Sequence, residues 1–448
     1  MKRKIWTLVA LLMLVVLTAA CIGGGTGGEA GSGSGSQQPA DTPAETGQDE
    51  NGASDPTEVP KLTVWHIEVG EQKNALEQAI KRFEEEHQVE VEFVQHENDP
   101  YKTNLVVAMG AGNPPDVFHS WGGGWLKQFA DAGQVLDLTE KIDPSQYVGA
   151  ALSATTFDDR IYGVPMTLGI APVFYNKEIF EQYNLTPPET YSELLEIVDT
   201  LNENGIIPFA LANQTKWPGA LYLIYFADRI AGHELFDSAF ARTGRGFDDP
   251  AYVRAGEMIQ ELVQRNAFPE GFNGLNYDTG QARALLYSGK AAMMLMTSGF
   301  ISNVRDEAPE FEEKLDIFNF PAVEGGEGDP SNVVGGVSPA FSVAASSKHP
   351  ELAVELVKFL TSVEVAQEYT NITGKISAVQ GVVSDDPFGQ RFTEFLQQAG
   401  NMQTYYDQTL PPELGELHKD TTQALFGLDM TPEEAARLME EKAKELLD

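Results

Sequence analysis

Apolar and polar residues alternate from Lys61 onward with two periods, one typical of strands and one typical of helices. The first five elements are predicted, in chain order, as strand, helix, strand, helix and strand at 61–67, 71–87, 89–94, 102–109 and 116–119. Within the first helix the apolar residues follow the i, i+3, i+4, i+7 spacing of one helix face: Leu76, Ala79, Ile80 and Phe83. Strands that alternate with helices in this way predict a parallel sheet covered by helices, an α/β fold.

The later part of the chain has the same class of pattern without repeating the sequence. Strands or extended segments are predicted at 171–175, 291–297 and 333–345, and helices at 191–204, 250–263 and 350–360. A last helix is predicted to start at Pro432, with Thr431 as its N-cap. Ligands of open α/β sheets bind outside the carboxyl ends of the strands. The strand exits at 65–68 and 119–125 are therefore predicted to face one cleft.

The first twenty residues have the composition of an export signal. Three basic residues near the N-terminus precede sixteen uncharged residues, 5–20, a run shorter than the ~20 residues needed to cross a bilayer. The run ends in small residues before Cys21, and this junction resembles a bacterial lipobox, although Thr18 stands where Leu, Val or Ile is usual. The resemblance implies that 1–20 is a lipoprotein signal peptide and that Cys21 is acylated, as with palmitate. The alternative is an ordinary secretory signal followed by a chance cysteine.

Residues 21–60 are predicted to form a lipidated, flexible and acidic linker. After Cys21, the segment 22–60 contains seven acidic residues among many Gly, Ser and Pro, and it has no Lys, Arg or aromatic residue. Such a segment cannot bury enough apolar surface to fold. As a flexible coil it would span roughly 35 Å root-mean-square. The linker would hold a globular body away from a membrane, to which the protein is attached only through its lipid.

Composition narrows the classes of function. The 448 residues predict two or three domains, and the 42% apolar fraction is sufficient for a large core. With 67 acidic and 30 basic residues the net charge is −37, which disfavours nucleic-acid binding. A single cysteine excludes an internal disulfide and a cysteine-cluster zinc site. The histidines have no metal-ligand spacing and no Walker A motif is present, so neither a metal nor a cofactor is expected.

Several short motifs occur in a fixed order along 61–448. They are Gly112-Asn-Pro-Pro-Asp116, Asp131-Ala-Gly-Gln-Val-Leu-Asp-Leu138, Phe174-Tyr-Asn-Lys177, Phe247-Asp-Asp-Pro250, Gly289-Lys-Ala-Ala-Met293, Gly335-Gly336 and Ser346-Ser-Lys-His-Pro-Glu-Leu-Ala353. Each motif is weakly specific alone, but the ordered set resembles the extracellular solute-binding proteins of family one, the sugar-binding group that includes the maltodextrin-binding proteins. The resemblance implies a two-lobed, class II periplasmic-binding-protein fold, with the ligand cleft between the lobes.

The same resemblance implies where the chain passes between the lobes. The crossovers are expected at 167–173, 334–339 and 374–378. Lobe one is then expected to comprise 61–170 and 336–375, and lobe two to comprise 171–335 and 376–448.

Sugar binding requires flat aromatic faces for the C–H side of a pyranose ring. Trp217 is the first candidate because the polar, turn-like segment 214–219 gives a tryptophan little reason to be in a core. Trp121 is the second, since three glycines after it allow the backbone to approach a ligand. Trp65, in an alternating strand, could bind sugar or pack. Phe300 matches a position at which related proteins offer an aromatic ring, although a phenylalanine after a buried strand is often core.

Sugar hydroxyls require carboxylates, amides and hydroxyl groups in fixed directions. His66 and Glu68 follow the first strand and are candidates for this role. Ser120, which precedes Trp121, is a further ligand-binding candidate. Asp116 is a candidate that could instead fix the loop at the start of its strand.

The resemblance implies a substrate-binding lipoprotein of an ABC importer, and no enzyme. It would capture a di- or oligosaccharide by hinge closure and deliver it to two permease subunits, as a monomer lipid-anchored at the outer face of the cytoplasmic membrane. Two alternatives stay open. One is a binding protein for a polyamine, peptide or iron chelate. The other is a lipid-anchored carbohydrate-active enzyme, because spatially paired carboxylates cannot be recognised from their spacing.

Overall fold

The computed structural model describes residues 59–448. The predicted signal peptide 1–20, Cys21 and nearly all of the predicted linker 21–60 therefore lie outside the described residues. Within the described part, no helix is both long and apolar enough to cross a membrane.

The first sheet has five strands in the order β2 (Glu90–Gln95), β1 (Lys61–His66), β3 (Val117–Ser120), β13 (Ala340–Val343) and β6 (Val164–Pro165). The first three strands are parallel, as the pattern predicts, while β13 and β6 add antiparallel neighbours. The sheet is thus mixed, because a segment from far along the chain returns to it.

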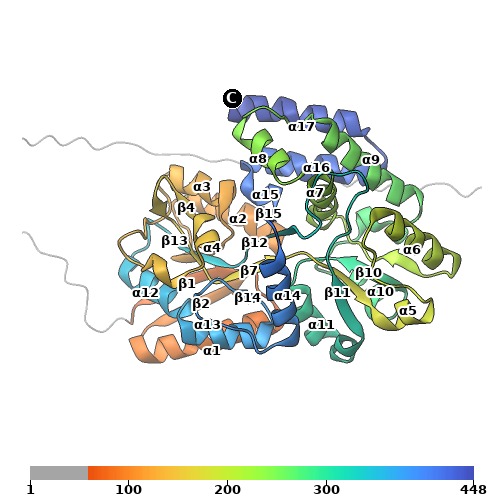
Figure 1. Ribbon diagram of the computed structural model, residues 1–448. Helices are drawn as coiled ribbons and strands as arrows, with labels where there is room; N and C mark the ends of the chain where they lie inside the picture. Colours follow the sequence, from red (N-terminus) through yellow and green to blue (C-terminus); the bar gives the residue numbers. More distant parts are fainter. Residues whose placement is uncertain (1–58) are drawn as a thin grey trace, which may run out of the picture. The chain divides into compact units, whose positions relative to one another are not determined.

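Helices α1 (Gly70–His87), α12 (Pro350–Leu360) and α13 (Val363–Thr373) pack together against this sheet, although α1 is distant from the other two in sequence (Figure 1). The predicted apolar face of α1 is buried, and Phe83 is fully enclosed. Helices α2 (Asn98–Gly110) and α3 (Gly123–Asp131) also belong to this part.

The second sheet has the order β11 (Leu315–Phe318), β8 (Val173–Asn176), β10 (Ala291–Leu295) and β9 (Ile207–Phe209). Only β10 and β9 run parallel. The helices of this part are α5 (Lys177–Gln182), α6 (Tyr191–Glu203), α7 (Trp217–Ala231), α8 (Glu234–Ala241), α9 (Pro250–Gln264), α10 (Gln281–Tyr287), α11 (Phe300–Glu307), α16 (Pro412–Gly427) and α17 (Pro432–Leu447).

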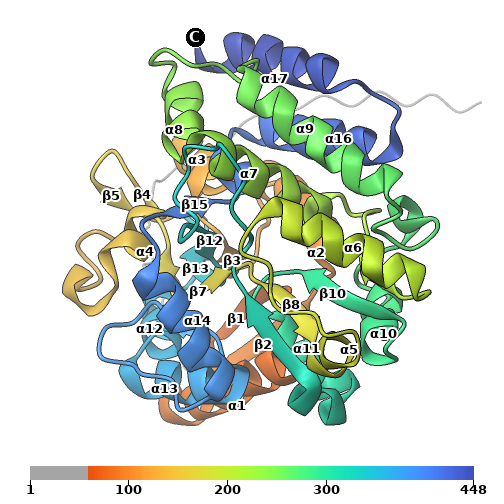
Figure 2. The ribbon, with the colours of Figure 1, turned by 45° about the vertical axis from the view of Figure 1, so that its right-hand side comes forward.

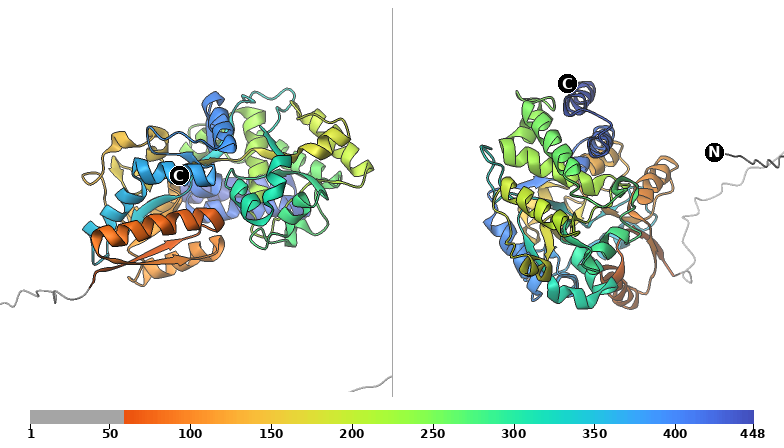
Figure 3. Two further views of the ribbon diagram at one scale, coloured as in Figure 1. Left: turned by 90° about the horizontal axis from the view of Figure 1, so that it is seen from below. Right: turned by 90° about the vertical axis from the view of Figure 1, so that its right-hand side faces the viewer.

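Helix α7 lies at the centre of the second part. It packs against α9 and α16, and α17 lies against α9 and α16 in turn (Figure 2). The right-hand view of Figure 3 shows the same C-terminal helices, in dark blue, beside green helices of the middle of the chain. Thr431 caps α17 as predicted, since its hydroxyl accepts a hydrogen bond from the amide of Glu434.

A third sheet contains the segments at which crossovers are predicted. Its order is β14 (Ile376–Ser377), β7 (Thr167–Ile170), β12 (Val333–Val337) and β15 (Met402–Thr404). Strand β7 is hydrogen-bonded to both β14 and β12. Segments from three distant parts of the chain are therefore tied together, while the lobe boundaries themselves stay a prediction.

The remaining elements connect these three sheets. They are α4 (Gly149–Ser153), β4 (Thr156–Phe157), β5 (Arg160–Ile161), α14 (Pro387–Gln398), α15 (Tyr406–Thr409) and the short 3₁₀ turns Pro144–Gln146, Phe272–Gly274 and Pro309–Lys314.

Candidate functional site

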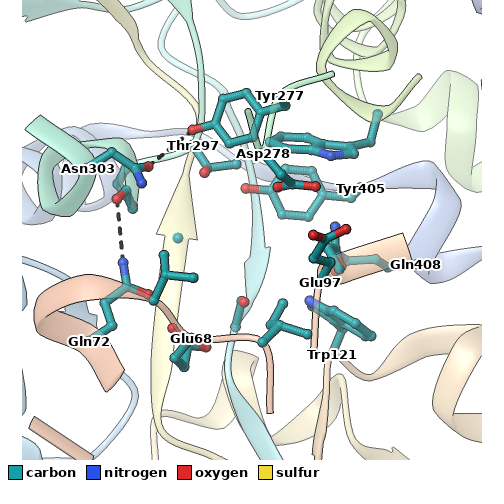
Figure 4. Close-up of a pocket in the computed structure, with 18 of the residues that line it drawn as sticks. Glu68, Gln72, Glu97, Trp121, Tyr277, Asp278, Thr297, Asn303, Tyr405 and Gln408 are labelled. Carbon is teal, nitrogen blue, oxygen red and sulfur yellow. Dashed lines mark hydrogen bonds between the residues drawn. The ribbon is translucent and has the colours of Figure 1, made fainter. Parts of the chain in front are cut away.

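A cavity of about 460 Å³ is lined by residues of the first and third sheets, of the segments that follow strands, and of several helices. This volume is within the usual range for small-molecule sites. Its polar and aromatic lining residues are Glu68, Gln72, Gln95, His96, Glu97, Asn98, Lys102, Trp121, Trp217, Tyr277, Asp278, Arg283, Thr297, Ser298, Asn303, Asp306, Glu307, Ser338, Lys375, Tyr405, Asp407 and Gln408. In Figure 4, Glu68 and Trp121 lie on one side of the cavity and Tyr277, Asp278 and Tyr405 on the other.

Four aromatic side chains line this cavity. Trp217 is the first residue of α7, and its half-buried ring packs edge-to-face on Tyr277 at a centroid distance of 5.0 Å. Trp121 follows β3 and is 5% exposed, because it packs against Trp125 and Tyr101. Tyr405 follows β15. Flat rings on several sides are suited to a ligand with apolar faces.

Every lysine and arginine of the cavity lining is already paired with a carboxylate. Lys102 Nζ lies 3.4 Å from Asp407 Oδ2, Arg283 Nη2 lies 2.5 Å from Glu307 Oε1, and Lys375 Nζ lies 3.4 Å from Glu68 Oε2. An anionic ligand would have to break one of these pairs. The site therefore favours a ligand that carries no negative charge.

Three carboxylates of the cavity lining, Glu97, Asp278 and Asp306, form no ion pair within 59–448. Partial removal from water raises the pKa of Asp278, and the nearby carboxylates of Asp99 and Glu97 raise it further. Figure 4 shows Asp278 and Glu97 directed toward the same part of the cavity. This edge of the cavity is therefore acidic.

Glu68 is at the centre of a buried polar network at the edge of the cavity. Its carboxylate contacts Lys375, accepts a hydrogen bond of 3.5 Å from the hydroxyl of Tyr369, and lies 3.3 Å from Nδ1 of His119. Burial by itself would raise the pKa of Glu68, but Lys375 and His119 outweigh that effect and lower the pKa to about 2. Glu68 is thus a charged group held in place by the protein itself.

Of the residues predicted to bind the ligand, the structure brings Glu68, Trp121 and Trp217 to the cavity. The segment 214–219 is not a turn throughout, since α7 begins at Trp217. The ring of Trp217 contacts hydrophobic clusters as well as the cavity.

Three further candidates lie at or near the ends of strands of the first sheet but do not line the cavity. Trp65 packs at 4.6 Å from the ring of His96, which itself lines the cavity. His66 is fully buried and stacks on Phe93 at 3.6 Å, and burial lowers its pKa to about 4, so the ring is neutral. Ser120 is buried, with its hydroxyl 2.8 Å from that of Ser342.

Asp116 and Phe300 are also absent from the cavity lining. Asp116 precedes β3, where its carboxylate accepts hydrogen bonds from the amide of Thr63 and the hydroxyl of Ser347. Those contacts correspond to the loop-fixing role that the sequence left open. Phe300 has no exposed surface and packs edge-to-face on Phe174 at 4.9 Å. It is a core residue, because α11 begins there and turns the ring inward.

Sequence reasoning missed most of the lining contributed by the second part of the chain. Tyr277 and Asp278 lie in an irregular segment before α10, where no hydrophobic period exists to assign a direction. Ser298 follows β10, and the strand-exit rule that selected Glu68 would have selected it too. No three His, Cys, Asp or Glu side chains in 59–448 form a group that could hold a metal ion.

The family model for bacterial extracellular solute-binding proteins matches residues 69–367. This chain belongs to that family. A solved structure from work on xylan utilization by the thermophilic bacterium Caldanaerobius polysaccharolyticus is similar, with 31% identity and a TM-score of 0.80 over 85% of this chain and 99% of that chain.

Two curated relatives have similar identities. The multiple sugar-binding protein of Streptococcus mutans is 25% identical over 72% of this chain and 77% of its own length. The galactooligosaccharide-binding protein of Bacillus subtilis is 25% identical over 75% of this chain and 77% of its own. As an extracellular solute-binding protein, the chain has the two-lobed α/β fold of its family, and the family works outside the cytoplasm.

Proposed function

We propose that this protein is the sugar receptor of an ABC importer, and that it binds a neutral di- or oligosaccharide in the 460 Å³ cavity. The observation that carries the proposal is the lining itself. Four aromatic rings and several uncharged hydrogen-bonding groups surround the cavity. Its lysine and arginine side chains are already paired with carboxylates. Relatives named for the sugars they bind support the same class of ligand.

The proposed mechanism is hinge closure of lobe one, 61–170 and 336–375, against lobe two, 171–335 and 376–448. Two contacts would cross between these lobes at the cavity. They are the Lys102–Asp407 ion pair and a long hydrogen bond of 3.5 Å from Gln72 Nε2 to the carbonyl oxygen of Gly299. A sugar that touches both lobes favours the closed form through its additional contacts. The permease subunits would recognise the closed, loaded form, and no covalent chemistry is involved.

The test is thermal stabilisation of purified 59–448 by a panel of sugars: xylotriose, raffinose, diacetylchitobiose and galactobiose. A ligand at one hundred times its Kd stabilises the folded state by about 2.7 kcal/mol. We expect this shift with one chemical group of sugars. Recovery of shortened sugars from the incubation would instead identify an enzyme.

A polyamine is the second candidate, and the carboxylates of Glu97, Asp278 and Asp306 favour it. Three acidic side chains without cationic partners in 59–448 would attract a linear polycation. A shift with spermidine and none with any sugar would replace the sugar assignment.

Membrane attachment is proposed to depend on Cys21, which ends an apolar run and precedes the acidic linker. In the full chain, Cys21→Ala should abolish attachment, leaving the protein released or unprocessed. The measurement is fractionation of membranes with mass analysis of the N-terminus. Retention in the membrane fraction after correct removal of the signal would contradict the lipoprotein assignment.

A further inference from the structure

Two buried hydroxyl groups of cavity-lining residues have no hydrogen-bond partner within 59–448. They are Tyr405 Oη and Ser298 Oγ. Tyr405 is 7% exposed and Ser298 is 1% exposed. A buried hydroxyl without a partner is unfavourable. Two of them beside one cavity therefore indicate that something other than the described chain completes their hydrogen bonds.

Both hydroxyls flank Gly169, which also lines the cavity and is the one residue of β7 that is not fully buried. A β-carbon placed on Gly169 would lie 3.5 Å from Ser298 Oγ and 3.9 Å from Tyr405 Oη. A ligand atom at the place of that β-carbon would thus be close to both hydroxyl groups. We call Gly169, Ser298 and Tyr405 the cavity floor.

Rigid backbone contacts fix the positions of the floor residues. The amide of Ser298 donates a 2.7 Å hydrogen bond to the carbonyl oxygen of Ile170, at the end of β7. The ring of Tyr405 lies against Gly336 of β12, so closely that a β-carbon there would be only 2.8 Å from the ring. The backbone of Ser298 and the ring of Tyr405 are therefore held in place before any ligand arrives.

The chemistry of the floor is neutral. Burial raises the pKa of Tyr405, so its phenol stays protonated and can donate a hydrogen bond. The serine hydroxyl can donate or accept. Lys375, a cation of the cavity lining, is already paired with the carboxylate of Glu68. Such groups match sugar hydroxyls and offer no counter-charge to an ionic substituent.

We propose that the cavity floor binds adjacent hydroxyl groups of one uncharged pyranose ring, the ring that enters deepest, and that Tyr405 and Ser298 determine specificity there. This inference rests on the proposed sugar-binding function. In this arrangement Gly169 leaves room for the pyranose ring, while Tyr405 and Ser298 supply the hydrogen bonds.

The first test uses Tyr405→Phe and Ser298→Ala in 59–448, with the tightest-binding sugar of the panel above as the probe. Each variant should weaken sugar binding about tenfold or more by calorimetric titration, because a sugar hydroxyl loses its partner in a dry site. The melting temperature without sugar should stay the same or rise, since an unsatisfied buried hydroxyl has been removed. A merely structural role would lower the melting temperature instead.

Tyr222→Phe is the matched control. The hydroxyl of Tyr222 is also buried and without a partner in the described residues, but Tyr222 does not line the cavity. Its removal should leave sugar affinity unchanged.

Gly169→Ala tests the floor by filling it. The added methyl group would meet both hydroxyl oxygens at ordinary contact distances, so the fold should tolerate it. We expect unchanged melting without sugar and at least a tenfold loss of affinity. If the unaltered protein binds a sugar and all three variants bind it equally well, the floor proposal is overturned and the receptor function stands. If the unaltered protein binds no sugar, both fail.

Discussion

Trp217 has a packing role and a proposed binding role at once, because its half-buried ring contacts two hydrophobic clusters and the cavity. Trp217→Ala should weaken sugar binding at least about thirtyfold, the effect of removing a central aromatic anchor worth ~2 kcal/mol. It should also lower the melting temperature, because the contact with Tyr277 is lost. Trp217→Phe keeps an aromatic face and should retain most of the sugar affinity and most of the thermal stability. Unchanged affinity in calorimetric titration of Trp217→Ala would assign the residue to packing alone.

For Phe300 we expect a loss of stability and not a loss of sugar binding. Its ring is fully buried against Phe174, so Phe300→Ala should reduce the free energy of unfolding by about 3–5 kcal/mol. Urea unfolding measures this loss, and Phe300→Leu should show a smaller one. Sugar affinity, measured where the variant is still folded, should change less than it does in Trp217→Ala. If Phe300→Ala lowered sugar affinity without lowering the free energy of unfolding, Phe300 would be a binding residue and not a core residue.

Some side chains at strand exits could be placed from the sequence, whereas those on irregular segments could not. Glu68 follows β1, and a topological rule directs such residues toward the cavity. The same rule does not fix which side of a strand end a particular residue faces, and His66, two positions earlier, does not line the cavity. Tyr405 follows a three-residue strand that pairs with β12 far away in sequence. Its position depends on that long-range pairing, which no local pattern records.

At the scale of elements, the buried Glu68–Lys375 pair joins the exit of β1 to the segment between α13 and β14. The pKa of Glu68 is lowered from 4.5 to about 2, so the pair's stabilisation is complete above about pH 4.5 and disappears as the pH falls through about 2. Between pH 5 and pH 2.5 the unaltered protein should therefore lose more stability than a Glu68→Gln, Lys375→Met double variant, which lacks this titration. Urea midpoints across that range provide the measurement.

The single variant Lys375→Met is the sharper form of this test. It leaves the Glu68 carboxylate buried without its cation, and breaking a buried pair costs about 3–5 kcal/mol of stability. The double variant should recover much of that loss because no lone charge remains. If the single and double variants were equally stable, the pair would have no role in holding the segment between α13 and β14.

Elements with a clear period were predictable and those without one were not. The predicted helix at 350–360 is confirmed as α12, and the one at 191–204 as α6, which has a full capping box at Thr190 and Glu193. Helix α7 was missed because it is buried on nearly every side, so it has no polar face to reveal the helical period. The two-residue strands β4, β5, β6 and β14 are too short to contain any pattern.

At the scale of the whole molecule, proposed closure depends on contacts between segments assigned to different lobes. Lys102 on α2 and Asp407 on α15 are both largely buried, with side chains 18% and 12% exposed. Burial would raise the pKa of Asp407, but Lys102 and Lys419 lower it, so the carboxylate is charged and needs its cations. In the proposed mechanism the Lys102–Asp407 pair forms only when the lobes close, so Lys102→Gln would remove a contact of the closed form. Closure should become less favourable while each lobe's core is untouched.

Solution scattering and calorimetric titration test this role of Lys102. Without sugar, Lys102→Gln should have a larger radius of gyration in solution scattering than the unaltered protein, and saturating sugar should reduce the difference. Its sugar affinity should fall by a factor that matches the shift toward the open form, because only the closed fraction binds tightly. Lys102→Arg keeps the charge and should behave almost normally. Lys358→Gln breaks an exposed pair on α12 away from the cavity and should change neither quantity. Equal radii and equal affinities for Lys102→Gln and Lys358→Gln would show that this pair does not take part in closure.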